Sequence, residues 1–261
     1  MEDYIYPSIT PTRIESVVWN EKIYNQLVDS IRHSEEQWNE DQLRQHPNLH
    51  LGIDYVYKYR TINPEHPEWT EQLFAGEKLW SPSIPELNDP LEAAFVYAKA
   101  IADPVDADAV KMMMKSNWYG CICFSRHPIC VQMWAHYALN HSGFCIEYYR
   151  PSSFLLSVHC RPVLYRRRMP EIEGITAEIT GFMDRVFWTK SEAWEYEAEW
   201  RLRYPRTNAY TAPGLLKPHG VIFGLRTPDR TKHLLRSWAG DIRFGQIVLS
   251  REPYRIKVEW E

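Results

Sequence analysis

The sequence contains no run of about 18 consecutive apolar residues, the length that a membrane-spanning helix requires. Its first residues also lack a basic segment followed by an apolar one, so we expect no secretory signal peptide. Lys and Arg number 30 against 34 Asp and Glu, and this net charge of −4 excludes a global attraction to nucleic acid or to an anionic membrane. These absences predict a cytoplasmic protein with no membrane partner.

Glycine is scarce, with 11 in 261 residues, and no two glycines have the spacing of a phosphate-binding loop or a dinucleotide-binding fingerprint. The five cysteines are an odd number and are most simply free thiols in a reducing compartment. They match no standard zinc-finger spacing, since a single residue separates Cys121 from Cys123. The sequence therefore gives firm support to no cofactor and to no metal site.

Aromatic residues are abundant, with 11 Trp and 16 Tyr in a chain that is otherwise 44% hydrophobic and 25% charged. The two percentages are typical of a folded globular protein. So many indole and phenol rings indicate either extensive aromatic packing or rings that stack on a ligand.

The chain divides into two predicted parts. Residues 1–50 are predicted to be an N-terminal helical extension, because Ile23, Leu27 and Ile31 recur at four-residue spacing. Residues 51–261 are predicted to form a single domain. Alternating or short apolar segments predict its strands over residues 54–61, 78–81, 119–125, 144–149, 154–165, 198–204, 220–224, 247–249 and 255–260. Helical periodicity predicts its helices over residues 68–75, 91–102, 105–117, 129–139, 171–190 and 228–238. Because strands and helices interleave without regular alternation, the predicted fold class is α+β, with a mixed or antiparallel sheet core and packed helices.

Several motifs follow one another in order along the predicted domain. They are Tyr57-Lys-Tyr-Arg60, Leu87-Asn-Asp-Pro90, Cys123-Phe-Ser125, Trp134-Ala-His-Tyr-Ala138 with His141-x-Gly143, Lys190-x3-Trp194-x2-Glu197-x-Glu199-Trp-Arg201 and Ile222-Phe-Gly224. In this order they resemble the bacterial domain-of-unknown-function family 2971, from about residue 54 to the C-terminus. That resemblance implies a domain boundary and no particular activity.

The layout is also similar to that of NAD-dependent ADP-ribosyltransferases: a strand ending in Arg, an early Asn-Asp-Pro, a Ser-containing middle and a late strand with Glu. Only Ser125 stands where one branch of those enzymes has Ser-Thr-Ser. The resemblance implies NAD as a substrate and Arg60 as the cation for its pyrophosphate. It implies Tyr137 or Trp134 as the ring that stacks on nicotinamide. A carboxylate would hold the ribose while positive charge develops at the anomeric carbon.

That carboxylate is expected to be Glu197 or Glu199. On a strand, Glu195, Glu197, Glu199 and Arg201 would share one face. Neighbouring carboxylates raise each other's pKa unless a cation lies between them, and Arg201 or Lys190 would be that cation. The alternative is an exposed edge strand with solvated charges.

The predicted site residues fall into two groups. Catalytic roles are expected for Glu197, Glu199 and Arg201. Ligand-binding roles are expected for Tyr57, Arg60, Asn88, Asp89, Ser125, Trp134, His136, Tyr137, His141, Lys190 and Trp194.

Two other chemistries use the histidines and cysteines. Cys123, His127, His136, His141 and Cys145 offer zinc ligands for a metal-dependent hydrolase. A thiol hydrolase would instead use Cys123 or Cys145 as nucleophile and His136 as base, although burial in apolar strands makes a thiol inert.

Three function classes follow from these patterns. The first is an enzyme that uses NAD, either an ADP-ribosyltransferase or an NAD glycohydrolase. The second is a non-catalytic module that binds a small nucleotide-like ligand, in bacterial stress or phage defence. The third is the metal-dependent hydrolase. A protein and a nucleic acid both stay open as the acceptor of a transferred group.

Overall fold

The computed structural model describes residues 55–76, 78–92, 96–97, 120–149, 160–172, 186–204, 207–211, 216–251 and 255–261. The predicted N-terminal extension over residues 1–50 and the predicted helix over residues 105–117 lie outside this part of the chain.

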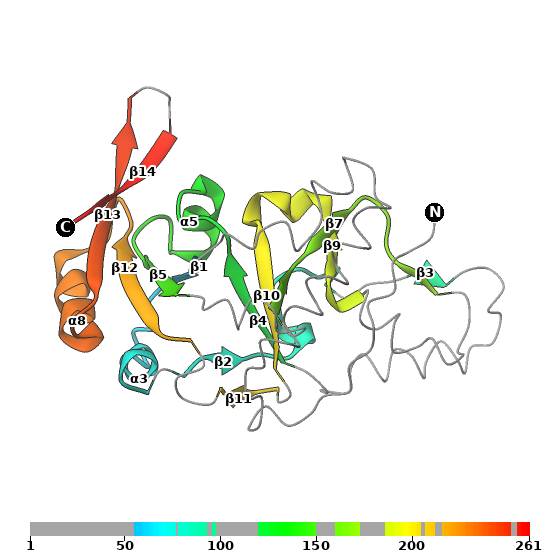
Figure 1. Ribbon diagram of the computed structural model, residues 1–261, viewed down its shortest axis with the longest axis horizontal. Coiled ribbons are helices and arrows are strands. Elements are labelled where there is room, and N and C mark those ends of the chain that lie inside the picture. The colour runs from blue at the N-terminus through cyan, green and yellow to red at the C-terminus, as the bar shows by residue number, and fades with distance from the viewer. Residues whose placement is uncertain are drawn as a thin grey trace, which may run out of the picture.

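One large sheet dominates the described part of the chain (Figure 1). Its eight strands lie in the order β14 (Arg255–Trp260), β13 (Arg243–Ser250), β12 (Pro218–Phe223), β5 (Phe144–Tyr149), β1 (Tyr55–Arg60), β4 (Gly120–Ser125), β10 (Glu199–Tyr204) and β6 (Cys160–Pro162). Neighbouring strands are antiparallel except β12 and β13, which are parallel. This mixed sheet with few helices confirms the predicted α+β class.

Short elements surround the sheet. The strand pairs are β2 (Trp80–Ser81) with β11 (Ala209–Tyr210), β3 (Val96–Tyr97) with β8 (Glu171–Ile172), and β7 (Leu164–Arg166) with β9 (Thr189–Ser191). The α-helices are α3 (Glu68–Gly76), α5 (Val131–Tyr137) and α8 (Asp229–Ala239), and the 3₁₀ helices are η3 (Ile84–Glu86) and η4 (Glu192–Glu197). Among the residues that the structure describes, no helix is long and apolar enough to cross a membrane.

Where the structure describes the chain, one helix prediction is wrong and a second is wrong in part, since Val186 and Phe187 of the second are helical. Val96–Tyr97, inside the helix predicted over residues 91–102, form β3. Glu171–Ile172 and Thr189–Ser191, the two ends of the helix predicted over residues 171–190, form β8 and part of β9. In each case the segment pairs in parallel with a strand far away in sequence, and such tertiary pairing overrides local helical periodicity.

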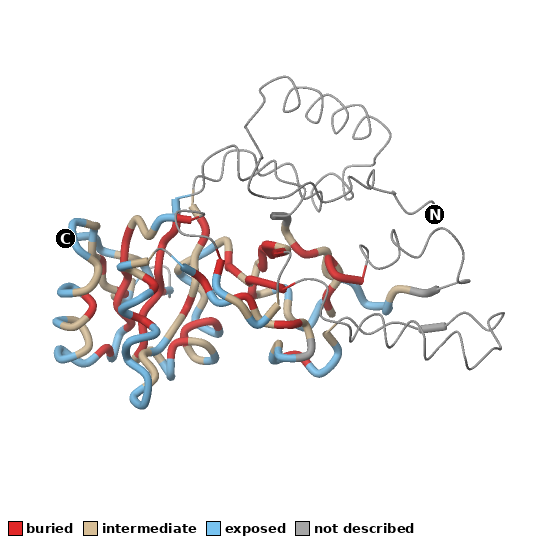
Figure 2. The backbone as a smooth tube through the Cα atoms, turned by 90° about the horizontal axis from the view of Figure 1, so that it is seen from below, coloured by how far each residue is buried: buried red, intermediate tan, exposed pale blue. Residues whose placement is uncertain are grey.

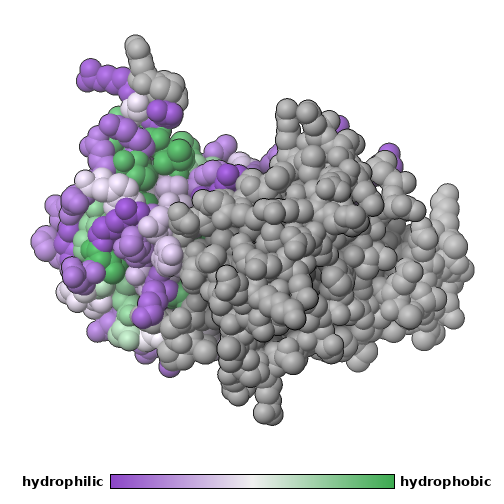
Figure 3. Space-filling model, viewed as in Figure 1, coloured by the Kyte–Doolittle hydropathy of each residue, from purple (hydrophilic) through white to green (hydrophobic). Residues whose placement is uncertain are grey.

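The two faces of the sheet pack against different helices. Alternation places Val56, Phe124 and Tyr148 on one face, in a core that includes Leu73 of α3 and Leu235 of α8. On the other face, side chains such as Tyr59, Cys145 and Ile222 pack against Met133 and Trp134 of α5. Buried residues accordingly run along the strands in Figure 2. Over α8 and β12 to β14, the outer surface mixes hydrophilic and hydrophobic residues (Figure 3).

The sheet opens between β1 and β4. Their register contains a single residue pair, Tyr57 with Ser125, whereas β1 pairs with β5 along its whole length. Beyond that pair, the ammonium Nζ of Lys58 donates a hydrogen bond of 2.8 Å to the carbonyl of Cys123. This opening positions the candidate site.

Candidate functional site

A cavity of about 270 Å³ lies at the opening between β1 and β4. Its lining comes from those two strands, from α5, from the segment over residues 82–92, and from the region of η4 and β9. The lining residues are Tyr57, Lys58, Tyr59, Pro82, Glu86, Leu87, Asn88, Glu92, Cys121, Cys123, Phe124, Ser125, Met133, Tyr137, Lys190, Glu197 and Glu199.

Two glutamates reach the cavity from either side of one turn. The hydroxyl of Ser191 accepts a hydrogen bond from Ala193 N and caps η4, which ends at Glu197. Ala198 then adopts a left-handed conformation, with φ of 43°, and β10 begins at Glu199. The expected strand face is therefore wrong for Glu195 and Glu197. Because the cap and the turn enforce a helical segment there, Glu195 is exposed while Glu197 is buried.

Lys190 lies between the two carboxylates. Its Nζ donates to Glu197 Oε2 at 2.5 Å and to Glu199 Oε2 at 2.8 Å. The indole ring of Trp194 is 5.1 Å from the same ammonium. The expectation that a cation separates the carboxylates is therefore confirmed.

Arg201 completes the network behind the cavity. The fully buried guanidinium donates from Nε to Glu199 Oε1 at 2.8 Å and from Nη1 to the carbonyl of Phe187 at 2.5 Å. Its Nη2 is 2.7 Å from Glu92 Oε1. Sequence reasoning missed Glu92 because it lay in a predicted helix. The signal that could have found it is the preceding Asn-Asp-Pro turn, in which Asp89 accepts a hydrogen bond from Leu91 N.

Uncharged polar groups hold Glu197 from two further directions. The Tyr137 hydroxyl donates to Glu197 Oε1 at 2.5 Å, and Asn88 Nδ2 donates to the Tyr137 hydroxyl at 2.5 Å. The Ser125 hydroxyl donates to the backbone carbonyl of Glu197 at 2.7 Å. The cavity therefore presents a chain of amide, phenol and carboxylate with fixed geometry.

The environment moves the pKa values of the two glutamates in opposite directions. Burial opposes ionisation of Glu199, but Arg201 and Lys190 outweigh burial and lower the pKa of Glu199 to about 2. Burial raises the pKa of Glu197 in spite of its contact with Lys190. A pair of carboxylates with divergent pKa values is typical of sites in which one group stays ionised while the other exchanges a proton.

Most of the predicted site residues converge here. Seven of them line the cavity: Tyr57, Asn88, Ser125, Tyr137, Lys190, Glu197 and Glu199. Arg201 and Trp194 contact this group from outside the lining.

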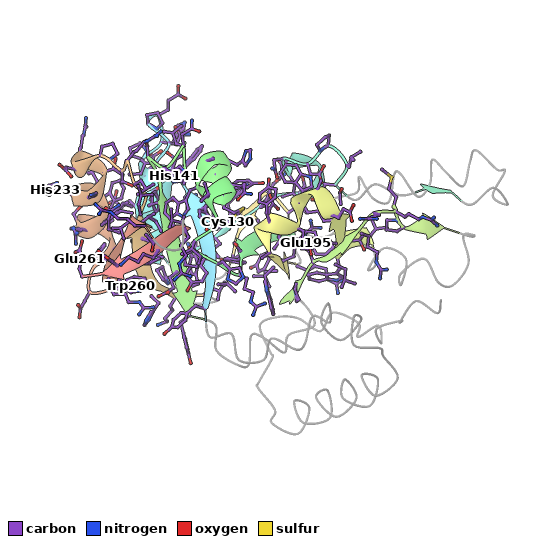
Figure 4. All side chains as sticks on the ribbon, turned by 90° about the horizontal axis from the view of Figure 1, so that it is seen from above. Cys130, His141, Glu195, His233, Trp260 and Glu261 are labelled. Carbon is purple, nitrogen blue, oxygen red and sulfur yellow. The ribbon has the colours of Figure 1, made fainter. Side chains whose placement is uncertain are left out.

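The aromatic and histidine residues of α5 take other positions. Trp134 is fully buried and donates from Nε1 to the Pro128 carbonyl at 2.7 Å, so its ring does not line the cavity. The His141 ring stacks nearly parallel to the Trp134 ring, with centroids 6.2 Å apart. His136 is exposed beside Tyr196. In Figure 4, His141 lies near α5 and Glu195 lies apart from it on η4.

Arg60 and Asp89 are also outside the lining of the cavity. The Asp89 carboxylate is used in the turn before Glu92. Burial lowers the pKa of Arg60, whose guanidinium interacts with the phenols of Tyr148 and Tyr210.

The residues that the structure describes give no support to the metal and thiol chemistries. Cys121 and Cys123 lie side by side, with their sulfurs 3.7 Å apart. Burial raises the pKa of the Cys145 thiol well above its usual range. Within the described ranges, no group of three or more His, Cys, Asp or Glu side chains is arranged to hold a metal ion.

One protein-family comparison gives a match. No curated protein and no solved structure matches the chain. A family model described as "Protein of unknown function (DUF2971)" matches residues 133–202, a span that runs from α5 into β10. This span includes Tyr137, Lys190, Glu197, Glu199 and Arg201. It leaves out β1 and Glu92. Over residues 133–202, the segment that carries most of the charged network, the chain is thus similar to the DUF2971 family, whose description assigns no activity.

Proposed function

We propose that the cavity binds the ribosyl part of a nucleotide-like ligand, with NAD as the substrate, and that Glu197 acts on its N-glycosidic bond. The reaction class is NAD hydrolysis or ADP-ribosyl transfer. The observation that carries this proposal is the position of Glu197, a buried carboxylate on the cavity wall between Lys190 and Tyr137.

The lining suits a ribose ring. Carboxylates accept hydrogen bonds from hydroxyl groups, and the Tyr137 phenol and the Asn88 amide add groups that both donate and accept. A volume of about 270 Å³ is near the lower end of ligand cavities and fits one nucleoside-sized portion of a dinucleotide.

The charges suit cleavage of an N-glycosidic bond. When that bond breaks, nicotinamide leaves with the electron pair and positive charge develops at the anomeric carbon. A fixed carboxylate beside that carbon stabilises the charge. Water, or the hydroxyl of an acceptor, then adds to the carbon and loses a proton. Glu197, with its raised pKa, is positioned to take that proton, while Glu199 stays ionised between Lys190 and Arg201.

The test is NAD consumption by the purified protein, alone and with bacterial lysate. Glu197→Gln keeps the size of the side chain and is expected to lower turnover by about 100-fold or more. Glu195→Gln is the matched control, because Glu195 is exposed on the same 3₁₀ helix. Circular dichroism checks that both variants fold. Equal turnover in the wild type and Glu197→Gln, or no turnover by the wild type under either condition, would contradict the enzymatic proposal.

A non-catalytic binding module is the second candidate. It is favoured by the two contacts of Lys190, which already pair its ammonium with the carboxylates of Glu197 and Glu199. For a binding module, we expect calorimetry to show binding of ADP-ribose without turnover. Tyr137→Phe should bind ADP-ribose more weakly, because the contact to Glu197 is lost.

A further inference from the structure

Two cations of β1 lie on the face of the sheet opposite to Tyr57 and Tyr59. Lys58 and Arg60 are two residues apart on the strand, so their side chains leave the same face. Lys58 Nζ lies 5.4 Å from the centre of the Phe124 ring. Burial, and to a smaller extent the positive charge of Arg60, lower the pKa of Lys58.

Neither cation forms an ion pair with a carboxylate among the residues that the structure describes, although the charge of Glu199 acts on Lys58 from beyond ion-pair distance. Lys58 donates to the Cys123 carbonyl, and the guanidinium of Arg60 makes no hydrogen bond within those residues. Lys190 and Arg201, by contrast, contact three carboxylates between them. Burial lowers the pKa of both Lys58 and Arg60. Partly desolvated cations without a counter-ion are costly, and a bound anion removes that cost.

An unpaired hydroxyl lies on the same face of the sheet, within electrostatic range of Arg60. Tyr148, which is 1% exposed, has a hydroxyl with no hydrogen-bond partner. Its ring meets the Phe124 ring edge-to-face, with centroids 5.7 Å apart. The Arg60 guanidinium is near enough to lower the pKa of this phenol against the larger effect of burial. Buried hydroxyls nearly always have a hydrogen-bond partner. The unpaired Tyr148 hydroxyl and the two cations without ion pairs therefore indicate one anionic ligand that interacts with all three residues.

Of Lys58, Arg60 and Tyr148, the residue that lies nearest to accessible side chains is Arg60. Arg60 is half-buried and interacts with Tyr210. Tyr210 is 40% exposed and packs edge-to-face on Trp80, which is 42% exposed, with ring centroids 5.2 Å apart. The exposed pair of Trp80 and Tyr210 therefore lies within electrostatic range of the guanidinium.

We propose that Lys58, Arg60 and Tyr148 form a binding site for a phosphate group, entered past Trp80 and Tyr210. The dianion matches the charge of two cations, its oxygens suit the fork of the guanidinium, and another oxygen accepts from the phenol. Lys58 also lines the cavity, whereas Arg60 and Tyr148 do not, so the phosphate site adjoins the cavity.

Calorimetric titration with inorganic phosphate, at constant ionic strength in chloride, tests the site. Arg60→Gln is expected to weaken binding about tenfold or more, since hydrogen bonds between charged groups contribute that much. Arg230→Gln, on the exposed surface of α8, is the matched control and should leave the affinity unchanged.

Tyr148→Phe separates binding from structure and keeps the test valid if Arg60→Gln fails to fold. It should weaken phosphate binding about fivefold to tenfold. Without phosphate its melting temperature should equal or exceed that of the wild type, because an unpaired buried hydroxyl is removed.

Adenosine monophosphate should bind more tightly than phosphate. Trp80→Ala should lower the affinity for adenosine monophosphate to that for phosphate and leave the affinity for phosphate unchanged. The site is disproved by an absence of saturable phosphate binding, by unchanged affinity in Tyr148→Phe, or by an equal loss in Arg230→Gln. Phosphate binding is read out directly, so these results stand apart from NAD turnover.

Discussion

Lys190 is the residue on which the carboxylates of the site most depend. It lies 3.9 Å from Glu92 and within hydrogen-bond distance of both Glu197 and Glu199. Among the residues that the structure describes, Lys190 and Arg201 are the cations that form ion pairs with these three carboxylates. Because burial raises the pKa of Glu92 and Glu197, the loss of either cation leaves buried carboxylates without compensation.

Replacing Lys190 with Met is predicted to lower the free energy of unfolding by about 3–5 kcal/mol, because the buried partners lose their cation. Urea denaturation measures the effect. Arg167→Met is the control, since Arg167 pairs with Glu192 at the surface, where ion pairs contribute little. Similar midpoints for the two variants would show that the buried network does not stabilise the fold.

Glu199 predicts a dependence of stability on pH. Its folded pKa is lowered to about 2, so the ionised form stabilises the fold at any pH above the ordinary pKa of a glutamate. That contribution is lost as pH falls toward 2, when the proton binds the folded state as well.

The wild type should therefore exceed Glu199→Gln in melting temperature near pH 7, and the difference should shrink between about pH 4.5 and pH 2. Calorimetric melting at a series of pH values provides the measurement. A difference that grows on acidification contradicts the assignment.

At the scale of single elements, the turn at Ala198 decides where the carboxylates point. The left-handed backbone there, with φ of 43°, ends η4 and starts β10. Without this turn, residues 197 and 199 would belong to one regular element, and the side chains of Glu197 and Glu199 would not both reach the cavity. Glycine adopts this conformation without the strain that a Cβ atom imposes.

Ala198→Gly is accordingly predicted to raise the free energy of unfolding by up to about 1 kcal/mol. Ala135→Gly, inside α5, is a control with an expected effect of opposite sign. It should lower the free energy of unfolding by about 1 kcal/mol. Urea midpoints of both variants test the signs. A clear loss of stability in Ala198→Gly would show that the turn is unstrained.

Local sequence patterns predicted much of the fold. The alternation around Tyr57 and the apolar runs before Ser125 and after Gly143 predicted β1, β4 and β5, and these strands are confirmed. The charged stretch at Glu197 predicted the candidate site and its intervening cation. The conformation of Ala198 could not be predicted, because alanine is not a residue typical of a left-handed turn. The approach of Glu92 to Arg201 joins positions more than 100 residues apart, which no local pattern encodes.

At the scale of the whole molecule, the sheet consists of two parts. Strands β14, β13, β12, β5 and β1 form one part, and β4, β10 and β6 form the other (Figure 1). Only the pair of Tyr57 and Ser125 joins β1 to β4 in register. Each part has continuous pairing of its own, so one can lose structure before the other.

Native-state hydrogen exchange in rising denaturant is predicted to reveal this order. Amides of β5 and β12 should exchange only on global unfolding, because each of these strands pairs along most of its length with both of its neighbours. Amides of β4 and β10 should exchange through an opening of lower free energy. A single common free energy for all four strands would show that the sheet unfolds as one unit.

The opening also affects which ligands this protein can come to accept. The cavity is bounded on one side by β1 and on the other by β4 and β10, so its width is set by the angle between the two parts of the sheet. Substitutions in the packing beneath either part can alter that angle by repositioning a whole strand. Ligand preference in related chains can therefore diverge while every residue that lines the cavity stays the same.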